Sequence, residues 1–230
     1  MKVAVIGNGL LGKEIVKLSN WDCISRSTHD FDFRDITTLY QYIKDYDIII
    51  NCVAHTDTYS NERELHWAIN YKAVSRLADW CNENDKKLVH ISTDYVYSNS
   101  VQYAKETDVP VHNPTWYGYS KALADGYIEN FSNDYLICRM THKPKPFPYD
   151  KAWVNQIGNF DYVDKQVKRL VDLIKLNASG IMNVGREVVS MYELAKETKE
   201  NVEQNECDYP VPSTITMNIN RMKGIINESN

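Results

Sequence analysis

The chain has 230 residues, of which 43% are hydrophobic and 25% charged, and this composition excludes disordered and fibrous proteins. A net charge of −5 without a basic stripe argues against a nucleic-acid partner. The absence of a long apolar run and of a signal peptide argues against membrane insertion, and an odd number of cysteines, interpreted as reduced thiols, favours a cytoplasmic location. The five cysteines have no CxxC spacing, so we expect neither disulfides nor a metal site, and Cys52 with His55 is interpreted as a structural pair.

The first 140 residues alternate short apolar strands with helices. The apolar runs predict strands over 2–6, 22–25, 47–53, 87–93 and 134–140. The segments between them predict helices over 10–19, 37–45, 64–84 and 116–131. Continuous apolar strands alternating with helices indicate a parallel sheet covered on both faces, which is a doubly wound α/β (Rossmann) fold.

The sequence changes in character after residue 140. Three prolines in THKPKPFPYDKAW (141–153) predict an irregular loop that leaves the sheet. A helix over 163–177, packed back on the first domain, a strand over 180–185 and a helix over 190–204 follow, the last beginning at a capping box of Ser190 and Glu193. Pro210 and Pro212 predict a loop before a last short element. We therefore expect a dinucleotide-binding domain over 1–140 and a small substrate-binding region over 141–230.

The stretch GNGLLG follows the first predicted strand and opens the first predicted helix. In a dinucleotide-binding loop of this pattern, Gly7 permits a tight turn, Gly9 the close approach of a diphosphate, and Gly12 contact between helix and strand. The diphosphate would lie at the helix N-terminus, where unpaired N–H groups favour an anion. We expect the whole loop to bind the cofactor: Gly7, Asn8, Gly9, Leu10, Leu11 and Gly12.

The second predicted strand is followed by Arg26 and has no acidic residue at its carboxyl end. An acidic residue there would bind the adenine-ribose hydroxyls of NAD, whereas a basic residue accommodates the 2′-phosphate of NADP. Arg26 therefore favours NADP(H), although a plain surface position for this residue leaves NAD(H) open.

Two further stretches carry groups suited to ketone chemistry. HISTDYVY ends the fourth predicted strand, where the hydroxyl of Thr93 could hydrogen-bond a carbonyl oxygen. Tyr117 and Lys121 are four residues apart and so share one face of the helix over 116–131. A nearby ammonium and a cationic nicotinamide favour the phenolate and lower the tyrosine pKa, which brings it closer to the range in which acid catalysis is effective.

Together, GNGLLG, NCVAHTDTYSNE, HISTDYVY and NPTWYGYSKALAD resemble the extended short-chain dehydrogenase/reductases, most closely the dTDP-4-dehydrorhamnose reductase family. The resemblance covers residues 1–140 and resumes at GIMNVGREVVSMYELAK (180–196). It implies an NADPH-dependent reductase of a 4-keto-6-deoxy sugar nucleotide, with hydride delivered to C4, in deoxysugar or glycan biosynthesis.

The resemblance also implies roles for individual residues. Thr93 would hydrogen-bond the keto oxygen of the substrate, and Tyr117 would protonate it. Lys121 would bind the nicotinamide ribose and tune Tyr117, and Tyr117 would itself contact the cofactor. The other matching positions are cofactor contacts at Asp32, Phe33, Val53, Ala54 and His55, and substrate contacts at Asp94, Tyr95 and His142. For each of these residues the alternative is that the side chain only packs in the core and binds no ligand, and this alternative is strongest for Phe33 and Val53.

Departures from the family pattern leave the sugar undetermined. The chain is shorter than is usual in the family, and the loss falls in the substrate-binding part. Ser98 and its neighbours replace a glycine that follows STDYV in the family. His142 stands where the rhamnose enzymes commonly have a tryptophan. An NAD-dependent nucleotide-sugar epimerase or dehydratase shares the same residues and stays open. A non-catalytic, NADP-binding regulatory subunit and a homodimer stay open too.

Overall fold

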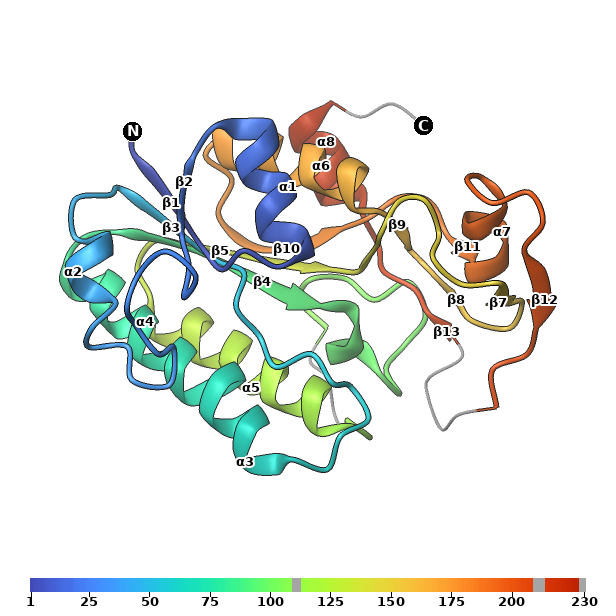
Figure 1. Ribbon diagram of the computed structural model, residues 1–230, viewed down its shortest axis with the longest axis horizontal. Helices are drawn as coiled ribbons and strands as arrows, with labels where there is room; N and C mark the ends of the chain where they lie inside the picture. Colours follow the sequence, from blue (N-terminus) through green and yellow to red (C-terminus); the bar gives the residue numbers. More distant parts are fainter. Residues whose placement is uncertain (109–112, 209–213, 228–230) are drawn as a thin grey trace.

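The computed structural model describes residues 1–108, 113–208 and 214–227. A six-stranded parallel sheet carries helices on both faces, and a smaller part made of short strands and one helix lies at one end of the sheet (Figure 1). The predicted doubly wound α/β fold is therefore confirmed.

The large sheet has the strand order β10-β5-β4-β3-β1-β2, and each neighbouring pair is parallel. Its strands are β1 (Val3–Ile6), β2 (Asp22–Ile24), β3 (Ile48–Asn51), β4 (Lys87–Thr93), β5 (Tyr135–Met140) and β10 (Gly180–Val184). The order reverses between β1 and β3. In doubly wound sheets, ligands bind beyond the carboxyl ends of the strands at such a point.

Each strand buries side chains on both faces of the sheet because successive residues point in opposite directions. In β1, Val3 and Val5 belong to one hydrophobic core, whereas Ala4 and Ile6 belong to the other. This is why the strands read as unbroken apolar runs, not as alternating ones.

Helices cover the two faces in separate groups (Figure 1). One group consists of α1 (Leu10–Ser19), α6 (Val163–Lys175) and α8 (Asn220–Ile226). The other consists of α2 (Tyr40–Ile43), α3 (Arg63–Leu65), the π-helix η1 (His66–Lys72), α4 (Ala73–Glu83) and α5 (Trp116–Phe131). Helix α6 contacts α1 and buries Val167, Leu170 and Ile174, so the chain returns to the large sheet after its excursion into the smaller part.

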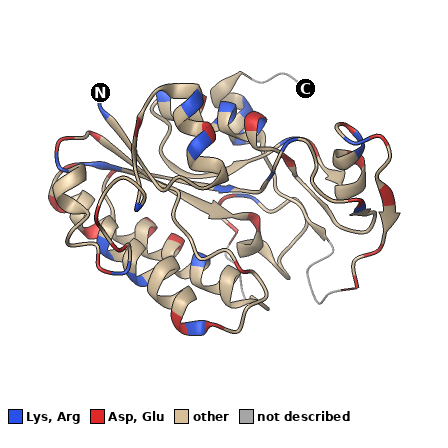
Figure 2. Ribbon diagram, in the orientation of Figure 1, with Lys and Arg blue, Asp and Glu red and all other residues tan. Residues whose placement is uncertain are grey.

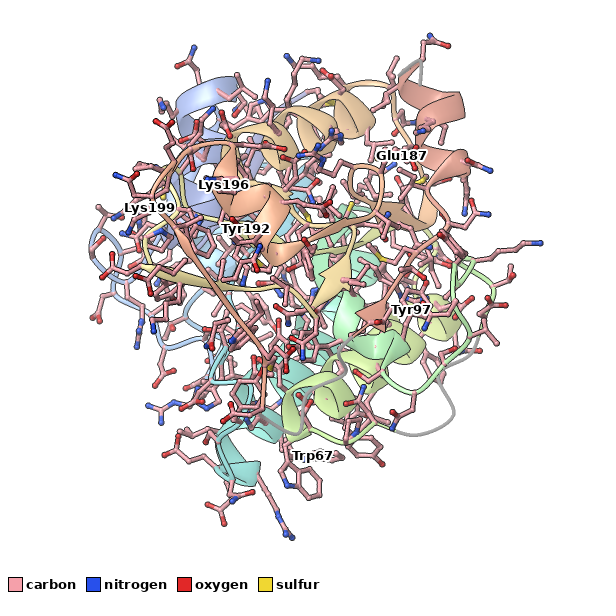
Figure 3. The ribbon with its side chains drawn as sticks, turned by 90° about the vertical axis from the view of Figure 1, so that its right-hand side faces the viewer. Trp67, Tyr97, Glu187, Tyr192, Lys196 and Lys199 are labelled. Carbon is pink, nitrogen blue, oxygen red and sulfur yellow. The ribbon has the colours of Figure 1, made fainter. Side chains whose placement is uncertain are left out.

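The smaller part has a core of its own, which includes Phe147, Phe160 and Leu194. Figure 3 views this part end-on, with Tyr192 and Lys196 of its helix labelled. Its elements are β6 (His142–Lys143), β7 (Lys151–Trp153), β8 (Ile157–Gly158), β9 (Asp161–Tyr162), β11 (Val189–Ser190), α7 (Met191–Lys196), β12 (Glu203–Asn205) and β13 (Thr214–Ile215).

Two predictions in this part were wrong in detail. Residues 141–153 are not wholly irregular, because β6 pairs with β9 and β7 pairs with β12, while the three prolines lie between β6 and β7. The helix expected over 190–204 ends at Lys196, and 203–205 form a strand. Pairing with distant segments overrides the local signal in both cases. The Ser190–Glu193 capping box is confirmed.

Two helices of the first half also differ from the prediction. The helix expected over 37–45 is reduced to Tyr40–Ile43, since Thr37 and Thr38 hydrogen-bond to Asp35 and hold a turn instead. The helix expected over 64–84 is helical from 63 to 83, but its segment 66–72 is a π-helix. Such π segments often occur at functional sites.

Charged residues of both signs are interspersed over the helices and loops (Figure 2). Every helix among the described residues is too short or too polar to span a bilayer. The loop expected around Pro210 and Pro212 lies outside the described residues, whereas the last short element is α8.

Candidate active site

The glycine loop after β1 has a conformation that side chains would prevent. Gly7 has φ +100°, in the region that favours glycine. A Cβ on Gly12 would lie 2.1 Å from the carbonyl oxygen of Gly7, whereas a Cβ on Gly9 would have no atom within 4 Å. The loop is therefore closely packed at Gly7 and Gly12 and open at Gly9, which suits the approach of a diphosphate to the α1 N-terminus.

Alanine substitutions should separate the close packing at Gly12 from the open space at Gly9. We expect Gly12→Ala to destabilise the fold by about 1–3 kcal/mol, because its methyl group overlaps Gly7. Gly9→Ala should leave the melting temperature unchanged and weaken cofactor binding instead. Thermal unfolding and NADPH titration of both variants measure the difference, and equal stability losses in the two would contradict it.

The end of β2 presents hydroxyl groups beside Arg26. Arg26 is exposed and forms no hydrogen bond or ion pair with the described part of the chain. The Oγ atoms of Ser25 and Ser27 lie 2.8 Å apart, and Asn8 donates from Nδ2 to Ser27 Oγ at 2.8 Å. Asn8 thus connects the glycine loop to the segment that carries Arg26.

Asp32 and Phe33 occupy different surroundings in the next loop. Asp32 forms an ion pair with Arg34, and their hydrogen bonds lower the pKa of Asp32. The side chain of Phe33 is buried in the core together with Ile24 and Ile36. Any contact of Phe33 with an adenine would therefore come from its backbone.

The loop after β3 is held by a buried asparagine of the π-helix. Asn70 Oδ1 accepts from the backbone N–H of His55 at 2.8 Å, and Asn70 Nδ2 donates to the backbone oxygen of His55 at 3.0 Å. Val53 lies against Gly7, since a Cβ there would be 3.0 Å from Val53 Cγ2. No sequence signal singled out Asn70, because its role depends on a contact with a separate loop.

The end of β4 places Thr93 and Asp94 in direct contact. Thr93 Oγ1 donates to Asp94 Oδ1 at 3.1 Å and accepts from the backbone N–H of Tyr95 at 3.2 Å. Burial raises the pKa of Asp94 to about 6, against the lowering effects of the Thr93 hydrogen bond and the Lys143 charge. The hydroxyl of Tyr95 lies 3.1 Å from that of Tyr59.

Tyr117 and Lys121 lie near the start of α5, whose N-cap Thr115 accepts from the backbone N–H of Gly118. Lys121 is 1% exposed, and its Nζ atom lies 2.9 Å from His90 Nε2 and 2.6 Å from the backbone oxygen of Ile91. His90 was not among the predicted residues, since an apolar strand with one histidine gives no sign of its partner.

The pKa of Tyr117 differs from the expectation. Burial raises it to about 12, the hydrogen bond with Thr93 opposes this, and the charges of Asp94 and Asp125 add to the rise. Burial also lowers the pKa of Lys121 to about 8. Lys121 is not among the groups that shift this pKa, so the lowering expected from an adjacent ammonium does not operate in this structure and burial dominates.

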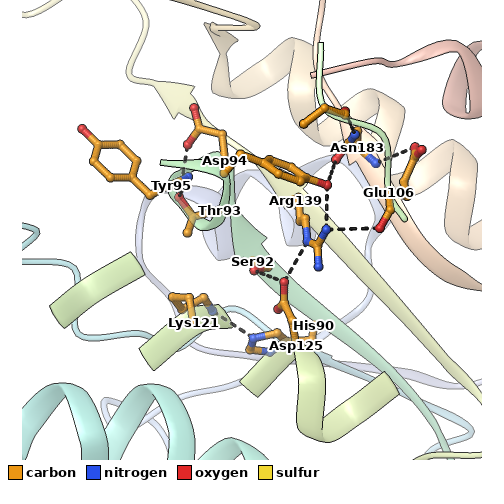
Figure 4. A network of polar contacts seen from close by, with 12 residues as sticks. His90, Ser92, Thr93, Asp94, Tyr95, Glu106, Lys121, Asp125, Arg139 and Asn183 are labelled. Carbon is orange, nitrogen blue, oxygen red and sulfur yellow. Dashed lines mark hydrogen bonds and ion pairs between the residues drawn. The ribbon is translucent and has the colours of Figure 1, made fainter. Parts of the chain in front are cut away.

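Behind these residues, a buried polar network ties α5 to the sheet (Figure 4). Asp125 Oδ2 accepts from Ser92 Oγ and from Arg139 Nε, at 2.9 Å each, and the two charged side chains are 1% and 5% exposed. Arg139 also donates to Tyr97 Oη at 2.6 Å, and Tyr97 donates to Asn183 at 2.9 Å. Burial acts to lower the pKa of Arg139, but the charges of Asp125 and Tyr97 and the hydrogen bonds to them together outweigh it and raise that pKa.

A cavity of about 990 Å³ joins the glycine loop, β4, α5 and the smaller part. Eleven of the predicted site residues line it: Gly9, Leu10, Leu11, Gly12, Ala54, Thr93, Asp94, Tyr95, Tyr117, Lys121 and His142. The others lie outside its lining: Gly7, Asn8, Arg26, Asp32, Phe33, Val53 and His55.

The smaller part contributes groups that the sequence did not indicate. Gln156, between β7 and β8, lines the cavity with its Oε1 buried and without a hydrogen-bond partner in the described chain. His142 also lines the cavity, and burial, aided by the Lys143 charge, lowers its pKa to about 4. Burial raises the pKa of Cys52, which also lines the cavity, to about 12, so this thiol is a poor nucleophile or metal ligand.

The parallel sheet, the glycine loop and the Tyr117–Lys121 pair in one cavity define an extended short-chain dehydrogenase/reductase fold. Within this class the chain belongs to the family described as the RmlD substrate binding domain, whose pattern matches residues 1–142.

Curated relatives agree with this assignment. The probable low-salt glycan biosynthesis reductase Agl14 of Haloferax volcanii is 29% identical over 140 residues, which are 59% of this chain and 45% of that protein. A dTDP-4-dehydrorhamnose reductase of Aggregatibacter actinomycetemcomitans is 28% identical over 57% of this chain and 47% of its own length. The match thus spans less than half of these relatives.

Solved structures match over nearly the whole chain. A hypothetical dTDP-4-dehydrorhamnose reductase from Sulfolobus tokodaii is 26% identical, with a TM-score of 0.83 over 98% of this chain and 94% of that one. The dTDP-4-dehydrorhamnose reductase of Bacillus anthracis, solved in complex with NADP, shares the fold at 24% identity, with a TM-score of 0.80 over 97% and 92%.

Proposed function

We propose that the chain is an NADPH-dependent reductase of a 4-keto-6-deoxy sugar nucleotide. The observation that carries this proposal is that Thr93, Tyr117 and Lys121 line the same cavity as the open glycine loop at the α1 N-terminus. The named reductases among its relatives support the same reaction class.

The residues of the cavity have distinct tasks in this reaction. A bound reduced nicotinamide supplies the hydride, while Tyr117 supplies the proton to the oxygen of the ketone. A phenol with a pKa of about 12 keeps its proton at neutral pH, as a proton donor must. Thr93 orients the ketone oxygen, and its hydroxyl must turn away from Asp94 to do so. Lys121 holds the nicotinamide ribose.

We assign the cofactor to residues 1–140 and the sugar nucleotide to residues 141–230. The glycine loop fits a diphosphate because the space at Gly9 is open. From residues 141–230, His142, Lys143 and Gln156 provide polar groups to the lining of the cavity. The buried, unpartnered oxygen of Gln156 suits a hydroxyl or N–H donor on the substrate.

Arg26 and the neighbouring serine hydroxyls would bind the 2′-phosphate of NADPH. We expect Arg26→Ala to raise the Kd for NADPH about 10- to 100-fold, because a hydrogen bond to a charged group contributes about 1.5–3 kcal/mol. The Kd for NADH, which lacks this phosphate, should change little. Fluorescence titration with both cofactors measures this, and an equal loss for both would show that Arg26 does not read the phosphate.

The function is tested by NADPH oxidation with 4-keto-6-deoxy sugars linked to dTDP, UDP or GDP. Turnover with one of them supports the reductase and identifies the nucleotide. Tight NADPH binding without turnover of any of the three would favour the regulatory subunit. Conversion of a nucleotide sugar with bound NAD, without net cofactor consumption, would favour an epimerase or dehydratase.

A further inference from the structure

A chain of hydrogen bonds, part-buried at its first link and buried at the next two, leads from the loop after β3 to Lys121. The backbone N–H of Val53 donates to Asn51 Oδ1 at 3.0 Å, and Asn51 Nδ2 lies 3.2 Å from His90 Nδ1. On the other side of the ring, His90 Nε2 lies 2.9 Å from Lys121 Nζ. Asn51 and His90 are fully buried, and Lys121 is 1% exposed. Figure 4 shows the contact between His90 and Lys121.

The hydrogen bond from Val53 to Asn51 determines which atom donates and which accepts in the two hydrogen bonds that follow. A backbone N–H can only donate, so the oxygen of the Asn51 amide must face Val53. The amide NH₂ then faces His90 Nδ1, which must accept. A neutral imidazole that accepts at Nδ1 carries its proton on Nε2, and this N–H points at Lys121 Nζ. An ammonium has no lone pair with which to accept it.

We infer that Asn51 and His90 hold Lys121 as a neutral amine in the cofactor-free protein, with His90 in the Nε2–H tautomer. Any arrangement with a charged Lys121 places two donors face to face at one of these three junctions, of which the two at His90 are buried and the one at Val53 is part-buried. Loss of a buried hydrogen bond disfavours that arrangement. The remaining N–H groups of Lys121 can donate, one of them to the backbone oxygen of Ile91.

The groups around Lys121 agree with this assignment. Burial holds the pKa of His90 well below its usual range, so the ring is neutral. Burial likewise lowers the pKa of Lys121 to about 8, and the mismatch with His90 Nε2–H must lower it further for the amine to be neutral at pH 7. Asp125 favours the ammonium, but its carboxylate is paired with Arg139. Cys52 and Tyr117 carry pKa values raised to about 12 and are uncharged at neutral pH.

The consequence for catalysis rests on the function proposed above. In the cofactor-free protein a neutral Lys121 exerts no charge that would draw the proton from Tyr117, so the phenol carries its proton before NADPH and the ketone bind. An enzyme that begins by oxidising an alcohol needs the phenolate instead. Asn51 and His90 therefore act as positioning residues that prepare the cofactor-free site for reduction by keeping the Tyr117 proton in place.

The test uses nuclear magnetic resonance of the cofactor-free protein with isotope-labelled histidine and lysine. Ring proton–nitrogen correlations report the tautomer, and a His90→Gln variant assigns the signals. We expect the Nε2–H tautomer for His90 and an amine signal for Lys121 at neutral pH. Asn51→Asp keeps the acceptor for Val53 but also accepts at His90 Nδ1, so it should reverse the chain and raise the titration midpoint of Lys121 by about one to two pH units.

Asn84→Asp adds the same charge at an exposed position and should change neither signal. Two results for the wild-type protein at neutral pH would each overturn the inference: the Nδ1–H tautomer of His90, or an ammonium at Lys121. Both can be measured even if Asn51→Asp does not fold. The measurement needs no substrate. An inactive enzyme with the Nε2–H tautomer would therefore refute the proposed function and leave the inference intact.

Discussion

Replacing Tyr117 with phenylalanine is expected to slow ketone reduction by about a hundred- to ten-thousandfold, the usual contribution of a positioned general acid. The variant removes the hydroxyl that gives the proton and keeps the ring that packs in the cavity. NADPH affinity should therefore stay close to that of the wild type. Single-turnover oxidation of NADPH with the keto-sugar substrate identified by the assay measures the chemical step.

Tyr119→Phe is the matched control for this experiment. Tyr119 lies on the same helix but is 44% exposed, and it does not line the cavity. Its loss of a hydroxyl should leave the rate unchanged. Equal rates for wild type and Tyr117→Phe would remove Tyr117 from the mechanism, and a similar decrease in both variants would point to a general effect on α5.

The second large effect is expected on stability. Arg139→Met leaves the carboxylate of Asp125 buried without its cation, and breaking a buried pair in this way costs about 3–5 kcal/mol. Because Asp125 lies on α5, one turn from Lys121, the loss should also loosen the helix that carries the site. For a chain of this size the melting temperature should fall by roughly 6–20 °C.

The double variant Asp125→Leu with Arg139→Met separates the uncompensated charge from the loss of packing. It removes both charges at once, so it should recover a large part of the stability lost in Arg139→Met. Chemical denaturation of the three proteins gives the free energies of unfolding. Similar losses in the single and the double variant would show that packing, and not the unpaired carboxylate, accounts for the effect.

Several features of the chain follow from its sequence because they depend on neighbours along it. Strand runs such as 2–6 and 87–93 are buried on both faces and appear as unbroken apolar stretches, so they were predicted within one residue at each end. The turn at Gly7, the start of α1 and the capping box at Ser190 need only local geometry. The spacing of Tyr117 and Lys121 likewise places both on one helix face and in one cavity.

Other features were decided by contacts between distant segments. The short strands β6, β7 and β12 exist because each pairs with a partner far along the chain, which proline content and helical periodicity cannot show. The protonation of Tyr117 and Lys121 depends on burial and on His90, 31 residues before Lys121. Residue types at the right spacing can thus be found in the sequence, but their pKa values and hydrogen-bond directions arise only when the fold removes water and brings β3, β4 and α5 together.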